Sequence, residues 1–375
     1  MVICIQGAPD VVHHKKTPLW TWILPIAGLV FFAGATFAGF DENFAASATG
    51  ILIAVILVPM LVSAVFAAVY HAEEAAHQTG EPFGTLILTI AVTIIELALI
   101  ISLLLSGKAN ATLVRDTVYA VIMIITTGLV GLCIITGGMR FREQTFDVTA
   151  AKIYLVVLIV LASLTLILPN YTATVAGPEY SKSQVAFVSL ATLLLYGVFL
   201  YSQTVLYRGY FISSGDDGAS SIASLGKLAR AILFLVLALA AVILLAKLFS
   251  AVVSFAVAAV GAPLPVVGVI IALIVLTPES IAAVKAAKDD NLQKSLNLAL
   301  GSSIATIGLT VPAMAIANAV LDKHMFLGLE ARDVTLLATA LAASILTFGT
   351  GKTNVLFGFI HLVLFAVFMF LVFVP

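Results

Sequence analysis

The chain has 375 residues, of which 62% are hydrophobic and only 10% are charged, and its formal net charge is −1. Soluble domains carry about 25% charged residues, so this composition excludes an ordinary water-soluble fold. The chain has no basic or acidic block, and it therefore lacks the electrostatic footprint of a nucleic-acid-binding protein.

The N-terminal segment MVICIQGAPDVVHHKK is a short polar tail. It lacks the order of basic region, apolar core and small-residue cleavage site, so we expect no removable signal peptide. Cys4 and Cys133 are too few and too far apart for a disulfide framework or a cysteine-rich metal site. We expect both to act as small apolar residues.

Long apolar runs dominate the rest of the chain. A helix needs roughly 20 apolar residues to cross the hydrocarbon core of a bilayer, and continuous runs favour helices over the alternating strands of a barrel. Residues 249–263 could form a re-entrant or interfacial piece. Eleven spans are predicted, at residues 18–38, 49–70, 82–105, 116–138, 150–168, 184–206, 228–247, 264–286, 295–319, 333–350 and 353–374.

Lysine and arginine predict the orientation of these spans. With the N-terminus in the cytoplasm, twelve of the 18 Lys and Arg residues lie inside and six lie outside. Positive charge concentrates on the cytoplasmic side of membrane proteins. The sequence therefore predicts a multi-pass protein of the inner (plasma) membrane, with a cytoplasmic N-terminus and a periplasmic or extracellular C-terminus.

The chain contains an internal repeat. Glu96 and Glu279 each follow a proline by fourteen residues, across an apolar run that begins at Pro82 or Pro265. Downstream, the segment ITTGL at 125–129 resembles ATIGL at 305–309. An Asp-Val-Thr triplet then follows in both halves, starting at Asp147 and Asp333.

Each repeat would contain five spans, and an odd number forces the second unit to enter from the opposite side. Inverted repeats are typical of secondary transporters, which bind substrate near the bilayer midplane between the two halves. We predict an all-α polytopic membrane protein with 11 transmembrane helices, made of two inverted five-helix repeats and one extra N-terminal helix. Its parts would be residues 1–48 (tail and first span), 49–207 (first repeat), 208–227 (cytoplasmic linker) and 228–375 (second repeat).

Both glutamates are predicted to lie deep in the membrane, because fourteen helical residues span about 21 Å. Carboxylate and hydroxyl oxygens are the ligands that Ca²⁺, Na⁺ and Mg²⁺ prefer. We therefore predict that Glu96 and Glu279 bind the transported metal cation and couple it to protons. The predicted supporting ligands are Thr93, Thr277, Ser280, Ser302, Ser303 and Thr306.

Two helical stripes of hydroxyl residues accompany these acids. Thr85, Thr89 and Thr93 share the face of Glu96, while Ser295, Ser302, Thr306 and Thr310 form the second stripe. Pro278 and Pro312 lack an N–H, which frees the carbonyls of Ile274 and Gly308 to face a cation. Alternatively, the hydroxyls only hold neighbouring helices together.

Two uncompensated carboxylates are expensive in hydrocarbon, where even one charge costs about 2.5–3.5 kcal/mol. One Ca²⁺ neutralises the pair, and so do two protons. If only the neutralised site can change the side to which it opens, exchange of cation for protons becomes obligatory.

Four segments resemble the ChaA-type branch of the calcium/proton exchangers, within the calcium:cation antiporter superfamily. They are HAEEAAHQTGEPFGTLILTIAVTIIE, GGMRFREQTFDVTAA, TPESIAAVKAAKDDNLQKSLNLALGSSIATIGLTVP and GKTNVLFGFIH. The resemblance implies eleven spans, two inverted halves and a central site with one glutamate from each repeat, at Glu96 and Glu279.

The chain departs from that family at the motif around each glutamate. Typical calcium/proton exchangers have Gly-Asn-Ala-x-Glu, where this chain has Val92-Thr-Ile-Ile-Glu96 and Val275-Leu-Thr-Pro-Glu279. The amide ligands are absent, Ser280 replaces the usual histidine, and the acidic linker is reduced to Asp216-Asp217. Substrate choice among Ca²⁺, Na⁺ and K⁺ therefore stays open.

A cluster of His71, Glu73, Glu74, His77 and Glu81 falls between the second and third spans. We predict that Glu74 and Glu81 form a cytoplasmic mouth that gathers cations; the alternative is a solvated loop. Lys285, Lys288, Asp289 and Asp290 should mark a helix end, His361 should bond between helices, and Arg115 and Asp116 should form an ion pair.

The sequence thus predicts a proton-coupled cation antiporter rather than an enzyme, with no cofactor beyond the transported ions. Its partners would be cations, protons and the lipid bilayer, with no nucleic acid, and its oligomeric state stays open. One alternative is a Na⁺(K⁺)/H⁺ antiporter with little Ca²⁺ transport. Another is a cation channel, which would conduct downhill without proton exchange.

Overall fold

The computed structural model describes residues 18–38, 48–80, 83–106, 111–211 and 225–374, and these residues are almost entirely helical. Eleven helical segments in them are long and apolar enough to span a membrane, as predicted. They comprise α1 (Trp20–Phe37), α2 (Ala48–Thr79), α3 (Phe83–Leu105), α4–η2–α5 (Leu113–Met123, Ile124–Leu129, Val130–Phe141), α6–η3–η4 (Val148–Ala162, Ser163–Ile167, Leu168–Tyr171), α7–η5 (Lys182–Tyr201, Ser202–Leu206), α9 (Leu225–Ala259), α10 (Pro265–Lys288), α11–η6–α12 (Leu292–Ala305, Thr306–Thr310, Val311–Leu321), α13 (Ala331–Phe348) and α14 (Val355–Phe373).

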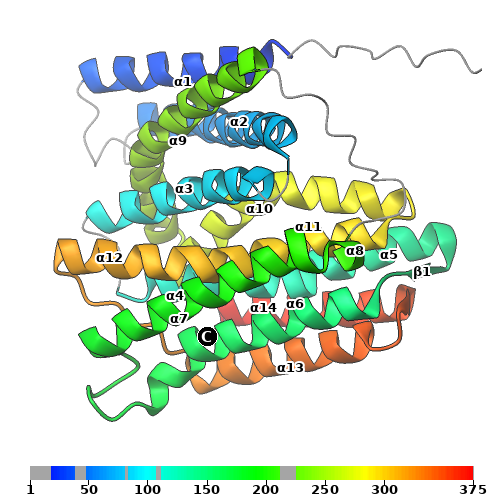
Figure 1. Ribbon diagram of the computed structural model, residues 1–375. Helices are drawn as coiled ribbons and strands as arrows, with labels where there is room; N and C mark the ends of the chain where they lie inside the picture. Colours follow the sequence, from blue (N-terminus) through cyan, green and yellow to red (C-terminus); the bar gives the residue numbers. More distant parts are fainter. Residues whose placement is uncertain (1–17, 39–47, 81–82, 107–110, 212–224, 375) are drawn as a thin grey trace, which may run out of the picture.

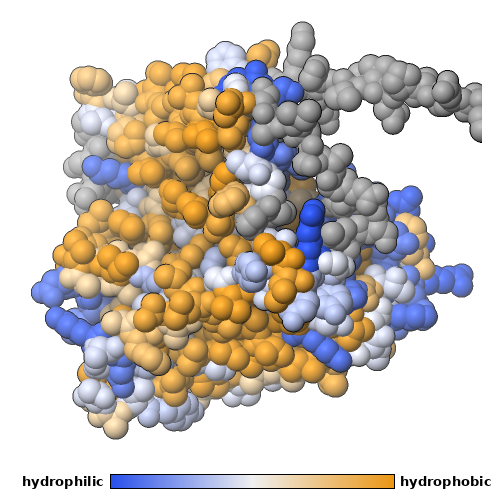
Figure 2. Space-filling view, viewed as in Figure 1, coloured by the Kyte–Doolittle hydropathy of each residue, from blue (hydrophilic) through white to orange (hydrophobic). Residues whose placement is uncertain are grey.

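The helices form two packed groups, with α3 between them (Figure 1). One group contains α1, α2 and α9, which pack on one another, and the other is built around the span that begins with α4. That span is the most enclosed: 89% of the residues in its 18-residue apolar stretch are buried, whereas the corresponding share is 22% for α1 and for α14 at the periphery. Apolar side chains cover the middle of the visible surface, and hydrophilic ones gather toward its left and right ends (Figure 2). This pattern suits a bilayer around the middle of the bundle.

The two segments that resemble each other in sequence adopt the same local structure. Both 125–129 and 305–309 overlap a π-helical turn, η2 in one span and η6 in the other. A π-turn displaces backbone carbonyls from the regular helical ladder and is frequent at functional sites. The packing is also reciprocal, because α3 contacts η6 while α10 contacts η2. This reciprocity is what two structurally equivalent halves require.

Connections at the two ends of the bundle fasten the halves together. At one end, β1 (Glu143–Thr145) pairs antiparallel with β2 (Lys352–Asn354), and Arg140 donates to the carbonyl of Lys288, the last residue of α10. At the other end, Arg115 donates to the carbonyl of Gly328 at 3.2 Å, and the predicted ion pair of Arg115 with Asp116 is present at 2.8 Å. The end of α10 at Lys288 agrees with the predicted helix end.

Two boundary predictions were wrong. Residues 249–263 are not a separate re-entrant piece, because α9 runs on to Ala259 and the first helix breakers are Gly261 and Pro263. The second span does not stop at residue 70, since α2 continues to Thr79 and ends before Gly80, which has a positive φ of 67°. In both places the prediction followed the hydropathy, whereas a helix ends where its backbone hydrogen bonds are interrupted.

The closest approach of α5 to α14 depends on a pair of glycines. A Cβ added at Gly131 would lie 2.9 Å from the carbonyl oxygen of Gly358, and one at Gly358 would meet the Gly131 carbonyl at the same distance. Small residues allow membrane helices to approach in this way, and their backbones then pack directly.

We predict that Gly131→Ala lowers the free energy of unfolding by about 1–3 kcal/mol, because the methyl group forces α5 and α14 apart. The thermal unfolding midpoint of the detergent-solubilised protein measures the effect. Gly197→Ala in α7 is the matched control, since its new Cβ would have no neighbour within 4 Å. An equal loss in both variants would contradict the close-packing explanation.

Candidate functional site

Glu96 lies in the middle of α3 and is almost completely buried, with 1% of its surface exposed. Its Oε2 accepts hydrogen bonds from Thr310 at 2.8 Å and from Thr306 at 3.3 Å. Its Oε1 is buried without a hydrogen-bond partner among the described residues. Oε2 is therefore stabilised by two hydroxyl donors, whereas Oε1 can still accept a hydrogen bond or contact a cation.

Glu279 lies on α10, directly after Pro278, at the position that corresponds to Glu96 in the repeat. Its Oε2 is also buried without a partner among the described residues. The Glu96 carboxylate is near enough to repel it electrostatically, and so is that of Glu73. Unsatisfied buried acceptors are costly, and a cation or protons at these oxygens would remove that cost.

The predicted supporting residues divide into groups. Thr306 contacts Glu96, and the Ser303 hydroxyl is buried with no partner in the described part of the chain. Thr93 and Thr277 instead donate to the carbonyls one turn earlier in their own helices, at Thr89 and Leu273. Donation leaves their oxygen lone pairs available, so these two stay predictions. The roles of Ser280 and Ser302, both half-buried, also remain predictions.

Thr310 is the residue missing from the predicted ligand set, although it makes the shorter bond to Glu96. The sequence held a signal for it, because Thr310 follows Thr306 by one helical turn in the second hydroxyl stripe. At the other end of the same stripe, the alternative of helix packing applies. Ser295 donates to the carbonyl of Ala283 in α10 at 2.7 Å and so serves helix packing.

The predicted cytoplasmic mouth is only partly described. Glu81 lies outside the described residues, and Glu74 is half-buried near the end of α2, in a helix rather than a loop. His71 is buried, with its Nε2 3.1 Å from the carbonyl oxygen of Thr21 in α1, so it does not line a mouth. The neighbouring Glu73 is the acid that interacts electrostatically with both Glu279 and Lys294.

Few side chains are available to hold a metal ion tightly. Among the described residues, no group of three or more His, Cys, Asp or Glu side chains could bind one. The described side-chain oxygens that contact Glu96 are the hydroxyls of Thr306 and Thr310.

His361 connects the π-turn η2 to its surroundings. It is fully buried, with Nδ1 2.8 Å from the carbonyl oxygen of Thr126 and Nε2 3.0 Å from Thr347 Oγ1. This agrees with the predicted interhelical role. Thr126 is the repeat counterpart of Thr306, so His361 supports the element that α10 packs against.

Comparisons with known proteins identify the family and the fold. The profile of the family described as "Sodium/calcium exchanger protein" matches residues 47–205 and 230–374. The protein y4hA of Sinorhizobium fredii is 43% identical over 97% of this chain and 98% of its own length. The sodium-potassium/proton antiporter ChaA of Escherichia coli is 33% identical over 74% of this chain and 77% of its own. The crystal structure of the Ca²⁺/H⁺ antiporter protein YfkE superposes with a TM-score of 0.71, at 17% identity, over 95% of this chain and 99% of that one.

We predict that His361→Leu destabilises the protein by about 1–3 kcal/mol, because the Thr126 carbonyl and the Thr347 hydroxyl lose a buried partner. Thermal unfolding in detergent measures the loss. The double variant with Thr347→Val should be less destabilised than the sum of the two single variants, by at least ~0.5 kcal/mol. Strict additivity would show that the two side chains do not depend on each other.

Proposed function

The chain belongs to the sodium/calcium exchanger protein family, and from that premise we propose that it exchanges Ca²⁺, Na⁺ or K⁺ for protons by alternating access at a central site containing Glu96 and Glu279. The observation that carries this proposal is a pair of partly unsatisfied carboxylates: Glu96 is buried on α3, and Glu279 is half-buried on the equivalent helix α10, with its Oε2 buried. A structural role alone would not require two ionisable groups at this depth.

Charge neutrality would couple the two fluxes. Two carboxylates at bilayer depth repel each other and cannot be carried through a closed, dry state while both are ionised. One Ca²⁺ or two protons neutralise them equally well. A single Na⁺ or K⁺ would require the second carboxyl to keep its proton. The carrier would therefore change sides only when loaded with a cation or with protons.

The two glutamates are not equivalent, and this difference gives them distinct roles. Glu96 accepts from Thr306 and Thr310, whose counterparts by the sequence repeat are Thr126 and Val130. Val130 offers no hydroxyl, and the Thr126 hydroxyl donates to the Ile122 carbonyl. Hydrogen-bond donors stabilise a charged carboxylate. Glu96 is accordingly the proposed stronger cation ligand and the second of the two to take up a proton, and Glu279 is the proposed first proton acceptor.

The proposed arrangement in the membrane has two inverted halves, at 49–207 and 228–375, with the N-terminus in the cytoplasm of a cell's plasma membrane. The family profile matches two separate ranges that lie almost wholly in these halves, which supports the division. The β1–β2 pair and the bond from Arg140 to Lys288 lie at one end of the bundle, and the bond from Arg115 to Gly328 lies at the other. This grouping supports the predicted division of the loops between the two sides of the membrane. A channel is the rival function, but the reciprocal packing of α3 and α10 favours a carrier.

The main test uses everted membrane vesicles in which a pH-sensitive dye reports the proton gradient. We predict that Ca²⁺, Na⁺ or K⁺ collapses the gradient with the unaltered protein, and that Glu96→Gln and Glu279→Gln each lower the apparent cation affinity more than a hundredfold. Breaking a buried charge pair costs about 3–5 kcal/mol, which corresponds to that factor.

Glu143→Gln is the control, because Glu143 is exposed on β1 at the end of the bundle. Cation flux without proton movement would favour the channel. Proton-coupled exchange that survives either central substitution would refute the two-glutamate mechanism. The order of response to the three cations would decide the substrate.

A second prediction concerns Thr310. Thr310→Val removes the shorter hydrogen bond to Glu96. The ionised Glu96 carboxylate is then less stable, so its protonated form becomes more favourable relative to the cation-bound form. Half-maximal exchange should require roughly tenfold more cation, since a hydrogen bond to a charged group contributes about 1.5 kcal/mol or more. Thr310→Ser keeps the hydroxyl and should behave as the unaltered protein. A shift in Thr310→Ser as large as that in Thr310→Val would contradict the hydrogen-bond explanation.

A further inference from the structure

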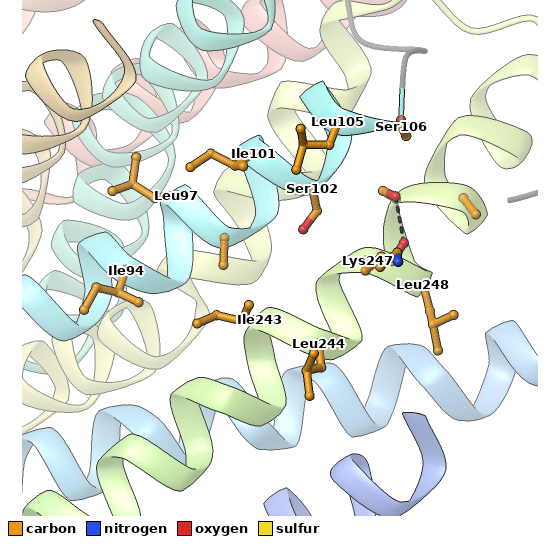
Figure 3. A pocket seen from close by; sticks show the side chains of 13 residues that line it. Ile94, Leu97, Ile101, Ser102, Leu105, Ser106, Ile243, Leu244, Lys247 and Leu248 are labelled. Atoms are coloured by element: carbon orange, nitrogen blue, oxygen red, sulfur yellow. Dashed lines mark hydrogen bonds between the residues drawn. The ribbon is translucent and has the colours of Figure 1, made fainter. Parts of the chain in front are cut away.

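A groove of about 800 Å³ lies between α3 and α9 (Figure 3), and neither Glu96 nor Glu279 lines it. Its walls come from one face of each helix. Most of the lining is aliphatic, and this part extends from the level of Ile94 and Ile243 toward the C-terminal end of α3. A space of this shape and lining suits a hydrocarbon chain.

Polar groups gather at the end of the groove near Leu105, the last residue of α3. Ser102 and Ser106 line it from α3, and Lys247 and Ser250 line it from α9. Figure 3 shows the Ser102 side chain projecting into the space between the two helices, with Lys247 across from it. The groove is therefore amphipathic along its length.

Lys247 carries a positive charge that the described residues do not balance. It is exposed, and it forms no salt bridge with any carboxylate in the described part of the chain. Ser250 donates to the Lys247 carbonyl at 2.8 Å, which leaves the ammonium group itself uncommitted. A cation at the edge of the hydrocarbon is costly unless it reaches water or an anion.

The depth of these groups matches the layers of a bilayer. Ile94 precedes the end of α3 by eleven residues, or about 16 Å of helix, so it lies well inside the hydrocarbon. Ser102 and Ser106 lie at the C-terminal end of α3, and Lys247 lies across the groove from Ser102. A lipid chain in the aliphatic part would place its phosphate beside the lysine.

We propose that this groove binds one anionic phospholipid, with an acyl chain between α3 and α9 and the phosphate held by Lys247 and the hydroxyl of Ser102. A basic pocket between membrane helices is a recognised arrangement for acidic headgroups. The uncompensated charge selects against lipids with no net charge. This site does not depend on the proposed transport function.

The test is native mass spectrometry of the full-length purified protein, equilibrated with equal amounts of phosphatidylglycerol and phosphatidylcholine that carry the same acyl chains. The unaltered protein should retain phosphatidylglycerol roughly fivefold in preference, the factor expected for one lysine near the headgroup. Lys247→Met should abolish this preference, and Lys247→Arg should keep it.

Two further variants locate the site. Lys182→Met removes another exposed lysine, at the start of α7 and outside the groove, and should leave the preference intact. Ala98→Phe fills the aliphatic part of the groove and should remove the retained phosphatidylglycerol even though Lys247 is present.

Three results would overturn the proposal. They are no lipid preference in the unaltered protein, a preference that survives Lys247→Met, and equal losses in Lys247→Met and Lys182→Met. A preference that survives Ala98→Phe would place the lipid elsewhere and would also overturn it. Because the readout is lipid retention, failure here is distinguishable from failure of cation exchange.

Discussion

The structure depends on one contact across its centre, where the Glu96 carboxylate from α3 accepts hydrogen bonds from Thr306 and Thr310. A charge in a low-dielectric interior must be paired, hydrogen-bonded or neutralised. The π-turn η6 supplies both hydroxyls from the other half of the chain. The contact therefore joins the two halves through the group whose charge is most expensive to bury.

The same region shows how two related halves can differ in function. α3 and α10 each carry a glutamate and each packs against a π-turn. In the π-turn η2, the carbonyl of Thr126 is hydrogen-bonded to His361. In the π-turn η6, the hydroxyls instead donate to Glu96. A shared backbone thus accommodates two different electrostatic environments, and only a few side chains set the difference.

Much of this arrangement could be predicted from the sequence, because apolar runs and a costly buried acid leave strong signals. The eleven spans and the packing of Glu96 near the second hydroxyl stripe follow from those signals. The helical continuation of α2 past residue 70 and of α9 past residue 247 could not be predicted from hydropathy, which reports the solvent around a helix rather than its hydrogen bonds. Which hydroxyls face Glu96, and which bond to their own backbone, depends on tertiary packing.

The short ladder of β1 and β2 has a mechanical consequence. It ties the segment after α5 to the segment before α14, while Gln144 from β1 also bonds to the Ala287 carbonyl and to Asp290. These hydrogen bonds hold α5, α10 and α14 together as one unit at that end of the bundle. In the described part of the chain, the group of α1, α2 and α9 takes part in no such strand pairing, so it is held to the rest of the bundle by helix packing alone.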